Sequence, residues 1–483
     1  MSIDWWVIFY AIIDLGVRIA AIIIVPRNRK PESALGWLLA IYFIPVIGIL
    51  LFLLIGSPKL PRGRRKMQDE INAVIRRQAK AIDTQVPVIT EPEWFEKVRT
   101  LKEELGAFPL VRGNSARLIH TYAESLEMMT EAVRRARTYV HVEFYILSLD
   151  DTTRPFFDAL ADAHRRGVMV RVLFDHWATS HKPFYRETIR FYKRAGIEYH
   201  RMLPLDLLHG KFQRPDLRNH RKLLVVDGEV GYMGSQNVID ASYNHRANLR
   251  RHLQWVDLMV ELEGPIVASV DTIFLSDWYA ETREIISDEI VLHGPVDAHT
   301  HLDAQMVPSG PGFSTENNLQ LFLALLAQAE TRVNIISPYF IPNEALLLAL
   351  NAAISRGVSI DLFVSEESDQ ALVYHAQRSY YEALLRAGVR IWMFPKPYIL
   401  HSKAMSVDGD VAVIGSSNMD LRSFGLNFEM SLLVRGRQIV DDLRDVEDHY
   451  RAVSTELTLE HWLQQPLRKV IWDNLARLTS ALQ

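Results

Sequence analysis

Residues 400–420, "LHSKAMSVDGDVAVIGSSNMD", place an imidazole, an ammonium and a carboxylate along one strand-like stretch, at His401, Lys403 and Asp408. A buried strand ordinarily excludes such groups unless something binds them or pairs with them. A small polar run, Gly415-Ser416-Ser417-Asn418, follows after six further residues. The stretch therefore predicts a polar site built on the strands of a folded core.

The same spacing occurs a second time, in "HRKLLVVDGEVGYMGSQN" at residues 220–237. Here His220, Lys222 and Asp227 precede Gly234-Ser235-Gln236-Asn237, again with six residues between the carboxylate and the glycine. Two copies of one spaced motif are very unlikely to arise by chance. We therefore expect two related halves in the chain.

Matching segments around the motifs predict a duplicated α/β fold. "FFDALADAHRRGVMVRVLFD" at 156–175 parallels "ALLLALNAAISRGVSIDLFVS" at 345–365, each with a helix, an Arg-Gly stop and a strand. Such alternation indicates βαβ units and an α/β sheet in each half. We expect the halves to span residues 111–295 and 296–483 and to pack about a pseudo-two-fold axis, which would bring both motifs to one site.

Two further features of the halves leave alternatives open. The offset between them is 192 residues at Gly196 and Gly388 but 181 at His220 and His401, so the first half carries an extra segment of 11 residues. That segment either lines the site entrance or is a tolerated surface loop. The end of the chain predicts an amphipathic helix that rests on the membrane or on the core, through Val470, Ile471, Leu475 and Leu478.

Composition excludes several kinds of chemistry. The chain has 483 residues, 48% of them hydrophobic and 23% charged, which is ordinary for a folded protein of two or three domains. Its net charge of −4 argues against a general nucleic-acid binder, so no nucleic-acid partner is expected. The absence of cysteine rules out disulfides, thiolate metal sites and cysteine nucleophiles.

The N-terminal residues predict a transmembrane hairpin over 1–58. Residues 34–56, "ALGWLLAIYFIPVIGILLFLLIG", run 23 residues without a charge, enough to span a bilayer core of about 30 Å. Residues 5–25 are almost as apolar but include Asp14 and Arg18, which lie four apart and can pair on one helix face. The first segment either spans the bilayer or lies partly in its interface.

A basic juxtamembrane connector is predicted over residues 59–110. Five cations follow the second apolar segment closely, against three in the linker between the segments; the five are Lys59, Arg62, Arg64, Arg65 and Lys66. An excess of Lys and Arg favours the cytoplasmic side, so we expect both ends of the hairpin and the catalytic halves in the cytoplasm. The connector is expected to be solvated and to contact anionic lipid.

The paired motifs suit an anionic phosphodiester. Two lysines and two asparagines, with serine hydroxyls, form a cradle of hydrogen-bond donors and positive charge; the predicted substrate-binding residues are Ser235, Asn237, Ser416 and Asn418. One histidine can attack phosphorus, and the other can protonate the leaving oxygen and then deprotonate the acceptor. An unperturbed histidine pKa of about 6.5 suits both roles.

Carboxylates complete the predicted set. Asp257 and Glu429 each precede a glycine by seven residues in equivalent segments, and either could accept a hydrogen bond from an imidazole Nδ1. Asp227 and Asp408 are grouped with the catalytic residues as motif members, although a structural role, pairing with backbone or Arg, is favoured for them. Metal ligation fits poorly, because a lysine stands two residues from each histidine and no second His or Cys is near.

At these residues the chain resembles the phospholipase D superfamily, whose signature is a duplicated H-x-K-x4-D-x6-G-S-x-N. The resemblance implies a phosphodiester enzyme that needs no metal or cofactor and forms a phosphohistidine intermediate, with His220 as nucleophile and His401 as acid and base. Within that superfamily, "ESALGWLLAIYFIPVIGILLFLLIGSPKL" and "NMDLRSFGLNFEMSLLV" are similar to bacterial cardiolipin synthases.

The resemblance implies transfer of a phosphatidyl group from one phosphatidylglycerol to another, with release of glycerol, at a bacterial inner membrane. The expected partners are phosphatidylglycerol, cardiolipin and the bilayer, with a homo-oligomer left open. A phospholipase D that hydrolyses phospholipid to phosphatidic acid is the main alternative, and residues alone do not decide between the two. A nuclease is disfavoured by the hairpin and the acidic balance, and an inactive scaffold by the intact motifs.

Overall fold

The computed structural model describes residues 5–27, 29, 31–56, 70, 73, 94–96, 108–206, 211–212, 214–286, 296, 302–313 and 315–479. The chain divides into two compact units, one of residues 1–65 with 214–216 and one of the remaining residues. The predicted basic connector lies almost wholly outside the described residues. Each unit is described by itself below.

Three helices form the N-terminal unit: α1 (Trp5–Ile24), α2 (Pro31–Phe43) and α3 (Pro45–Ile55). The predicted pair within α1 is confirmed, because Arg18 Nε donates to Asp14 Oδ2 at 2.7 Å. Helices α2 and α3 pack on each other, with the rings of Trp37 and Phe52 edge-to-face at 5.5 Å.

The second apolar segment is not the single helix that its length predicts. It ends one helix at Phe43 and begins another at Pro45, with Ile44 between them at φ −133° and ψ 67°. Proline lacks the N–H of a helical hydrogen bond and its ring clashes with the preceding turn, so it starts a helix more readily than it continues one. The prediction of one spanning helix over residues 34–56 was therefore wrong.

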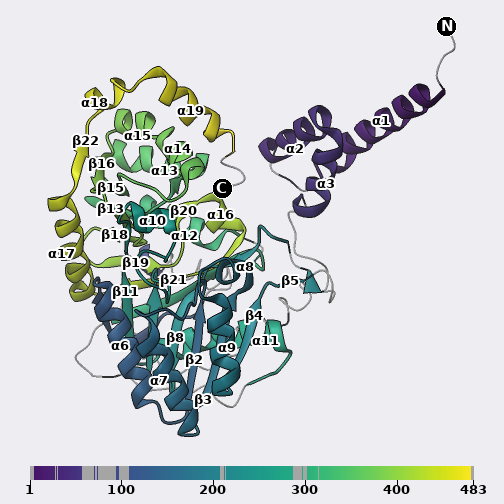
Figure 1. The fold of residues 1–483 in the computed structure, drawn as a ribbon. Helices are drawn as coiled ribbons and strands as arrows, with labels where there is room; N and C mark the ends of the chain where they lie inside the picture. Colours follow the sequence, from purple (N-terminus) through teal and green to yellow (C-terminus); the bar gives the residue numbers. More distant parts are fainter. Residues whose placement is uncertain are drawn as a thin grey trace. The chain divides into compact units, whose positions relative to one another are not determined.

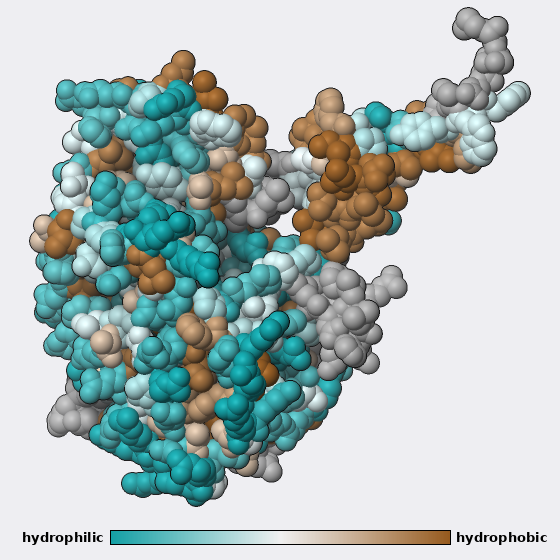
Figure 2. Space-filling model, in the orientation of Figure 1, coloured by the Kyte–Doolittle hydropathy of each residue, from teal (hydrophilic) through white to brown (hydrophobic). Residues whose placement is uncertain are grey.

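None of the helices in the described part of the chain is both long and apolar enough to cross a membrane. The N-terminal unit nevertheless exposes many large apolar side chains, which form the hydrophobic surface of α1–α3 in Figure 2. Among the most exposed are Trp5, Trp6, Phe43, Val46 and Leu53. Monomeric soluble proteins rarely expose so many large apolar side chains together.

The second unit is built on a 16-stranded mixed sheet, which confirms the predicted α/β class (Figure 1). The strands of the first half are β1 (Val111–Ile119), β2 (Tyr139–Phe144), β3 (Met169–Asp175), β4 (Glu198–Met202), β8 (Lys222–Val226), β9 (Val230–Gly234) and β11 (Met259–Glu263). Those of the second are β12 (Leu302–Ser309), β13 (Arg332–Ile336), β15 (Ser359–Ser365), β16 (Arg390–Phe394), β18 (Ala404–Val407), β19 (Val411–Gly415) and β21 (Asn427–Arg435).

The two halves repeat one strand order. Outward from the antiparallel pair β1 and β12, the first half runs β11-β9-β8-β2-β3-β4 and the second runs β21-β19-β18-β13-β15-β16, with β22 (Thr455–Leu457) added at the edge. In the first half β2, β3 and β4 pair in parallel, and in the second half β13, β15 and β16 do the same. The other neighbours in this order pair antiparallel, for example β2 with β8 and β13 with β18. The structure therefore bears out the duplication inferred from the motifs.

Helices cover both faces of this sheet. One face packs against α11 (Ile266–Thr282) and α17 (Arg437–Val453) in a single core that includes alternate residues of β8 and β19. The intervening residues of those strands face two other cores. One contains α6 (Tyr122–Arg135), α7 (Arg154–Arg165) and α9 (Tyr185–Ala195), and the other α12 (Asn317–Gln328), α13 (Glu344–Ser355) and α15 (Tyr381–Ala387). Successive side chains of a strand point to opposite faces of the sheet, and both faces are buried here. The sequences of the motif strands are therefore continuously apolar.

Two short strand pairs connect the halves next to the motifs. Strand β7 (Arg218–Asn219) pairs in parallel with the start of β21, and β10 (Gln254–Val256) pairs in parallel with β17 (Tyr398–Leu400). Each pair therefore joins the residues just before a motif histidine to the segment that carries the carboxylate of the opposite half. These pairings set the position of the site.

The predicted C-terminal helix is present as α19 (Leu467–Arg477) and contacts α14 (Ala371–Arg378). The contact is made by its polar side rather than its apolar stripe: buried Asp473 accepts from Arg378 Nε at 3.2 Å and lies 2.6 Å from His375 Nδ1. Ile471 and Leu475 remain 50% and 49% exposed. Of the two predicted resting places, the described contacts are with the core.

The extra segment of the first half includes a small antiparallel pair, β5 (Leu205–Asp206) with β6 (Lys211–Phe212). Residues 207–210 and 213 lie outside the described residues. Whether the segment lines the site entrance stays a prediction.

Candidate active site

His220 lies between β7 and β8 and faces the second half. Its backbone N–H donates to the carbonyl of Phe428 at 2.8 Å, which continues the β7–β21 pairing. Its ring Nδ1 lies 3.0 Å from Glu429 Oε2 and 3.1 Å from the Ser416 carbonyl. With Nδ1 occupied in this way, the other ring nitrogen, Nε2, is left for chemistry.

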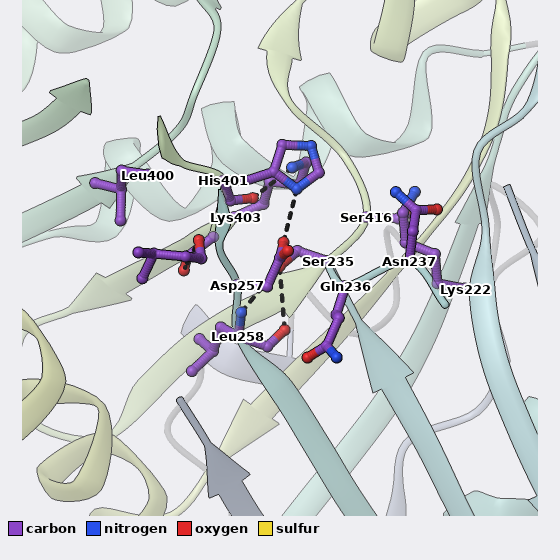
Figure 3. Close-up of polar contacts among 12 residues, drawn as sticks. Lys222, Ser235, Gln236, Asn237, Asp257, Leu258, Leu400, His401, Lys403 and Ser416 are labelled. Atoms are coloured by element: carbon purple, nitrogen blue, oxygen red, sulfur yellow. Dashed lines mark hydrogen bonds and ion pairs between the residues drawn. The ribbon is translucent and has the colours of Figure 1, made fainter. Parts of the chain in front are cut away.

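His401 is held in the same manner by the first half. Its N–H donates to the Val256 carbonyl at 2.7 Å, and its Nδ1 lies 2.6 Å from Asp257 Oδ1 (Figure 3). The carboxylate partners are therefore exchanged: Glu429 of the second half holds the first-half histidine, and Asp257 holds the second-half one. The sequence indicated the two carboxylates but not this crossing, because β7 and β10 are too short to predict.

The motif serines each form a hydrogen bond to one of the two carboxylates. Ser235 Oγ donates to Asp257 Oδ1, and Ser416 Oγ donates to Glu429 Oε2, each at 2.6 Å (Figure 3 shows Ser235 beside Asp257). Their hydroxyl hydrogens are thus used to orient the carboxylates. A buried carboxylate is a strong acceptor and lies within reach of each hydroxyl. A substrate role for Ser235 and Ser416 stays a prediction.

The motif asparagines are buried beside the same segments. Asn237 Oδ1 accepts from the Ile146 N–H at 2.9 Å, and its Nδ2 donates to the Tyr243 hydroxyl at 2.8 Å. An amide nitrogen carries two hydrogens, so one remains for another acceptor. Asn418 is 6% exposed, and its Oδ1 has no hydrogen-bond partner among the described residues. A substrate role for both stays a prediction.

Both motif lysines are buried and turn back on their own histidines. Lys222 Nζ donates to the His220 carbonyl and Lys403 Nζ to the His401 carbonyl. Burial, followed by the charge of the other lysine, lowers the pKa of Lys222 to about 7, while nearby carboxylates oppose the shift. Burial likewise lowers the pKa of Lys403 to about 8. An anion bound between these lysines would restore their charge.

Burial also lowers the pKa of each motif histidine to about 4. The carboxylate partner raises it, but both lysines lower it, and the charges of Lys222 and Lys403 act on both rings. This mutual influence places the two motifs in one electrostatic environment. The imidazoles are therefore neutral at pH 7, with Nε2 carrying a free lone pair when Nδ1 donates to its carboxylate.

The carboxylates are ionised despite their burial. Burial alone would raise the pKa of Glu429 and of Asp257, but the adjacent imidazole, the lysine charges and the serine hydroxyl together hold both below their usual values. Two ionised carboxylates therefore lie in the same buried site as two lysines whose positive charge a bound anion would strengthen. Such an arrangement favours the imidazolium when it forms and attracts an anionic substrate to the lysines.

Asp227 and Asp408 are not at this site. Asp227 follows β8, at the opposite end from Lys222, and accepts from the backbone N–H groups of residues 137–139 at 2.7–2.9 Å. Asp408 accepts in the same way from residues 330–332 at 2.8–2.9 Å. A part for them in catalysis stays a prediction. Their carboxylates hold the loop before β2 and β13, which is the structural role favoured for them.

Sequence reasoning missed a residue beside His220. The ring of Tyr145, just after β2, lies 4.8 Å from the His220 ring and 5.3 Å from Lys222 Nζ. The usable signal was its position, because strand ends border sites in α/β sheets.

A second group missed from the sequence lies behind His220. Arg221 Nε donates to the Glu429 carbonyl at 3.2 Å, and its guanidinium pairs with Asp277. Asn219 Nδ2 donates to Glu143 Oε1 at 2.9 Å. The charged residues flanking the motif in "RNHRK" were its only sequence signal. Within the described ranges, no three side chains of His, Asp or Glu gather as a metal site would require.

Two equivalent α/β halves that share a His-Lys site define the class of phospholipase D-like proteins. A family model described as "Cardiolipin synthase, PLD-like domain" matches residues 129–278 and again 322–449, and "Phospholipase_D-nuclease N-terminal" matches residues 16–57. The crystal structure of phosphatidylserine synthase from Haemophilus influenzae superimposes with a TM-score of 0.61 at 15% identity, covering 80% of this chain and 99% of that one, which supports the fold alone.

Curated relatives match nearly the full length. Cardiolipin synthase A of Pectobacterium atrosepticum is 31% identical over 487 residues, covering 99% of this chain and 98% of the relative. That of Proteus mirabilis is 30% identical over 485 residues, covering 98% and 97%. The chain belongs to the cardiolipin synthase family with duplicated phospholipase D-like domains.

Proposed function

We propose that the protein joins two phosphatidylglycerol molecules into cardiolipin and releases glycerol, at a single site shared by two halves related by a pseudo-two-fold axis. The observation that carries the proposal is the crossed pairing of His220 with Glu429 and of His401 with Asp257. It leaves two imidazole Nε2 atoms and two lysine ammoniums in one buried site. That set can bind one phosphodiester. It can also assist both steps of the transfer, the departure of the glycerol oxygen and the attack of the acceptor oxygen.

In the first step, His220 Nε2 attacks phosphorus and the bond to the glycerol oxygen breaks. The leaving oxygen takes a proton from His401, whose imidazolium is favoured by Asp257 and by the bound phosphodiester anion. Lys222, Lys403, Asn237 and Asn418 donate to the non-bridging oxygens as their charge grows. The products are a phosphatidyl-histidine and free glycerol.

In the second step, His401 accepts the proton from a hydroxyl of the second phosphatidylglycerol. The oxygen attacks phosphorus, the bond to His220 Nε2 breaks, and cardiolipin forms. One phosphodiester replaces another, so no external energy source is required. Assigning His220 as nucleophile follows the family resemblance, since the two histidines have similar surroundings.

We also propose that the unit containing α1–α3 attaches the enzyme to the bacterial inner membrane, with the catalytic halves in the cytoplasm. Its exposed apolar side chains and its match to the N-terminal family model support attachment. The wild-type chain has no cysteine, so Arg194→Cys on the surface of α9 provides a unique label. A membrane-impermeant maleimide should leave it unlabelled in intact spheroplasts and label it after lysis. Labelling before lysis would contradict the orientation.

The test of function uses purified full-length enzyme in liposomes with phosphatidylglycerol labelled in its glycerol headgroup. We expect cardiolipin and free glycerol in equal amounts, without added nucleotide. Phosphatidic acid as the sole lipid product would favour the hydrolase instead. His220→Ala and His401→Ala should each abolish turnover while leaving the circular dichroism spectrum unchanged, and full activity in either would contradict the shared site.

A further inference from the structure

Four polar residues bridge the halves beside the motif asparagines. This bridging cluster consists of Lys182 and Tyr243 from the first half and Tyr339 and Asp369 from the second. Lys182 Nζ lies 5.1 Å from the centre of the Tyr243 ring, and the Tyr339 hydroxyl donates to Asp369 Oδ1 at 2.8 Å. The opposite charges of Lys182 and Asp369 attract each other across the boundary.

The bridging cluster is connected to both motifs. On one side, the Tyr243 hydroxyl accepts the hydrogen bond from Asn237 Nδ2 at 2.8 Å. On the other, the Tyr339 carbonyl accepts from Ser337 Oγ at 2.7 Å, and that Oγ accepts from the N–H of Met419 at 3.1 Å. Met419 directly follows Asn418. The cluster is therefore adjacent to the two asparagines assigned to the phosphate.

Asp369 combines accessibility with a polar, partly enclosed setting. Asp369 is exposed as a residue, whereas Tyr243 is buried and Lys182 and Tyr339 are half-buried. Its charge also acts on Lys403. An accessible carboxylate next to the lysines repels a second phosphate but accepts hydrogen bonds from hydroxyl groups. Lys182 adds a hydrogen-bond donor, and the Tyr339 hydroxyl can both donate and accept. Together with the acceptor Asp369, these groups match the hydroxyls of a polyol better than an anion.

We propose that the bridging cluster binds the glycerol headgroup of the acceptor lipid, with Asp369 accepting from a hydroxyl that is not the attacking one. This inference rests on the proposed function and adds to it a site that selects the acceptor. A vicinal diol can place one hydroxyl on Asp369 and the neighbouring one near phosphorus. Water and simple alcohols have only one hydroxyl, which must lie near phosphorus to react, so they gain nothing from Asp369. The cluster therefore favours transfer to a polyol over hydrolysis.

A purely structural role for Asp369 is less consistent with its surroundings. The same loop is already tied to the first half by the ion pair between Glu367 and Arg251. A further brace between the halves would be expected to be fully buried, but residue 369 is exposed, although its surroundings desolvate the carboxyl enough to raise its pKa. The neighbouring ion pair provides a matched control, since Glu367→Gln removes a carboxylate two residues away.

The experiment compares acceptors in the full-length enzyme. Wild type, Asp369→Asn and Glu367→Gln are supplied with phosphatidylglycerol and either labelled glycerol or 1-propanol, and phosphatidic acid is measured in the same samples. Wild type and Glu367→Gln should prefer glycerol. Asp369→Asn should lose roughly tenfold to hundredfold of that preference, the loss expected for one hydrogen bond to a charged acceptor, and should form more phosphatidic acid per glycerol released.

The outcomes separate this inference from the proposed function. If Asp369→Asn slows all acceptors equally, or keeps the wild-type preference, the acceptor site is overturned while cardiolipin synthesis by wild type still stands. If wild type itself forms no cardiolipin, the proposed function fails. Thermal unfolding of the three proteins should agree within a few degrees, because residue 369 is exposed.

Discussion

The chemistry at the residue scale depends on which nitrogen of each imidazole is free. Glu429 Oε2 and Asp257 Oδ1 each accept from an Nδ1, and each is held in place by a serine hydroxyl. The result is one tautomer with its lone pair on Nε2. The carboxylate also stabilises the imidazolium that forms when that lone pair takes a proton.

Replacing either carboxylate by its amide should therefore lower kcat without unfolding the protein. In Glu429→Gln or Asp257→Asn the amide can donate to Nδ1, which favours the wrong tautomer, and the expected loss is roughly 10²- to 10⁴-fold. Initial rates of glycerol release measure it, with circular dichroism as the folding control. A loss smaller than about threefold would show that the carboxylates do not set the tautomer.

The pH dependence of kcat/KM should follow the free enzyme. The nucleophile must be neutral, and burial lowers the pKa of His220 to about 4; the acid must be protonated, and burial lowers the pKa of His401 to about 4 as well. The rate should therefore be highest near that pH and fall on both sides of it. The lysines must be charged, and the pKa of Lys222 is about 7, so the rate should fall further as pH rises past 7. Because bound phosphodiester raises the lysine pKa, the basic limb of kcat should lie at higher pH than that of kcat/KM. Coincident basic limbs would contradict this.

Much of the residue set was predictable from the sequence. The doubled spacing identified His220, Lys222, His401 and Lys403, and the equivalent positions before a glycine identified both carboxylates. The backbone pairing favoured for the motif aspartates is present, but the partners of the motif serines were not predictable, because they depend on which buried group each hydroxyl reaches. A spacing specifies position along a strand, but hydrogen-bond partners come from other strands.

At the scale of secondary-structure elements, the motif hairpins are fastened at the end away from the site. Asp408 lies in the turn between β18 and β19 with φ 50° and caps the N–H groups of residues 330–332; Asp227 does the same in the first half. Aspartate tolerates positive φ better than most residues. Each carboxylate therefore fixes both its own turn and the entry of the neighbouring strand.

Asp408→Ala should reduce stability rather than chemistry. It removes the acceptor of three backbone hydrogen bonds and one from the Thr331 hydroxyl, and we expect a loss of about 2 kcal/mol in the free energy of unfolding. Denaturant melts measure that loss. Turnover per folded molecule at low temperature should stay within about twofold of wild type, and a hundredfold loss at unchanged stability would return Asp408 to the catalytic set.

Some of the helices and strands were predictable from the sequence and others were not. The Arg-Gly stops and alternating helices indicated the βαβ units, because helix ends and buried strands have strong local signals. The uncharged run over residues 34–56 indicated one long helix, because its length was weighed without Pro45. Strands β7, β10 and β17 were not foreseen, since two or three residues carry no period.

At the scale of the whole molecule, duplication produces one site from two motifs. The strand order repeats outward from β1 and β12, and the crossed pairs β7–β21 and β10–β17 carry each histidine to the other half's carboxylate. Neither half holds a complete set of histidine and partner. A single chain therefore supplies both histidine–carboxylate pairs.

The most direct test of this shared site is to trap the intermediate. Enzyme mixed with phosphatidylglycerol labelled at phosphorus is quenched within one turnover at alkaline pH, digested, and searched by mass spectrometry for phosphohistidine peptides. The account predicts an acid-labile adduct on His220 alone, absent in His220→Ala and formed more slowly in Glu429→Gln. Cardiolipin formation with no adduct on either motif histidine, or with adducts on both in equal amounts, would contradict it.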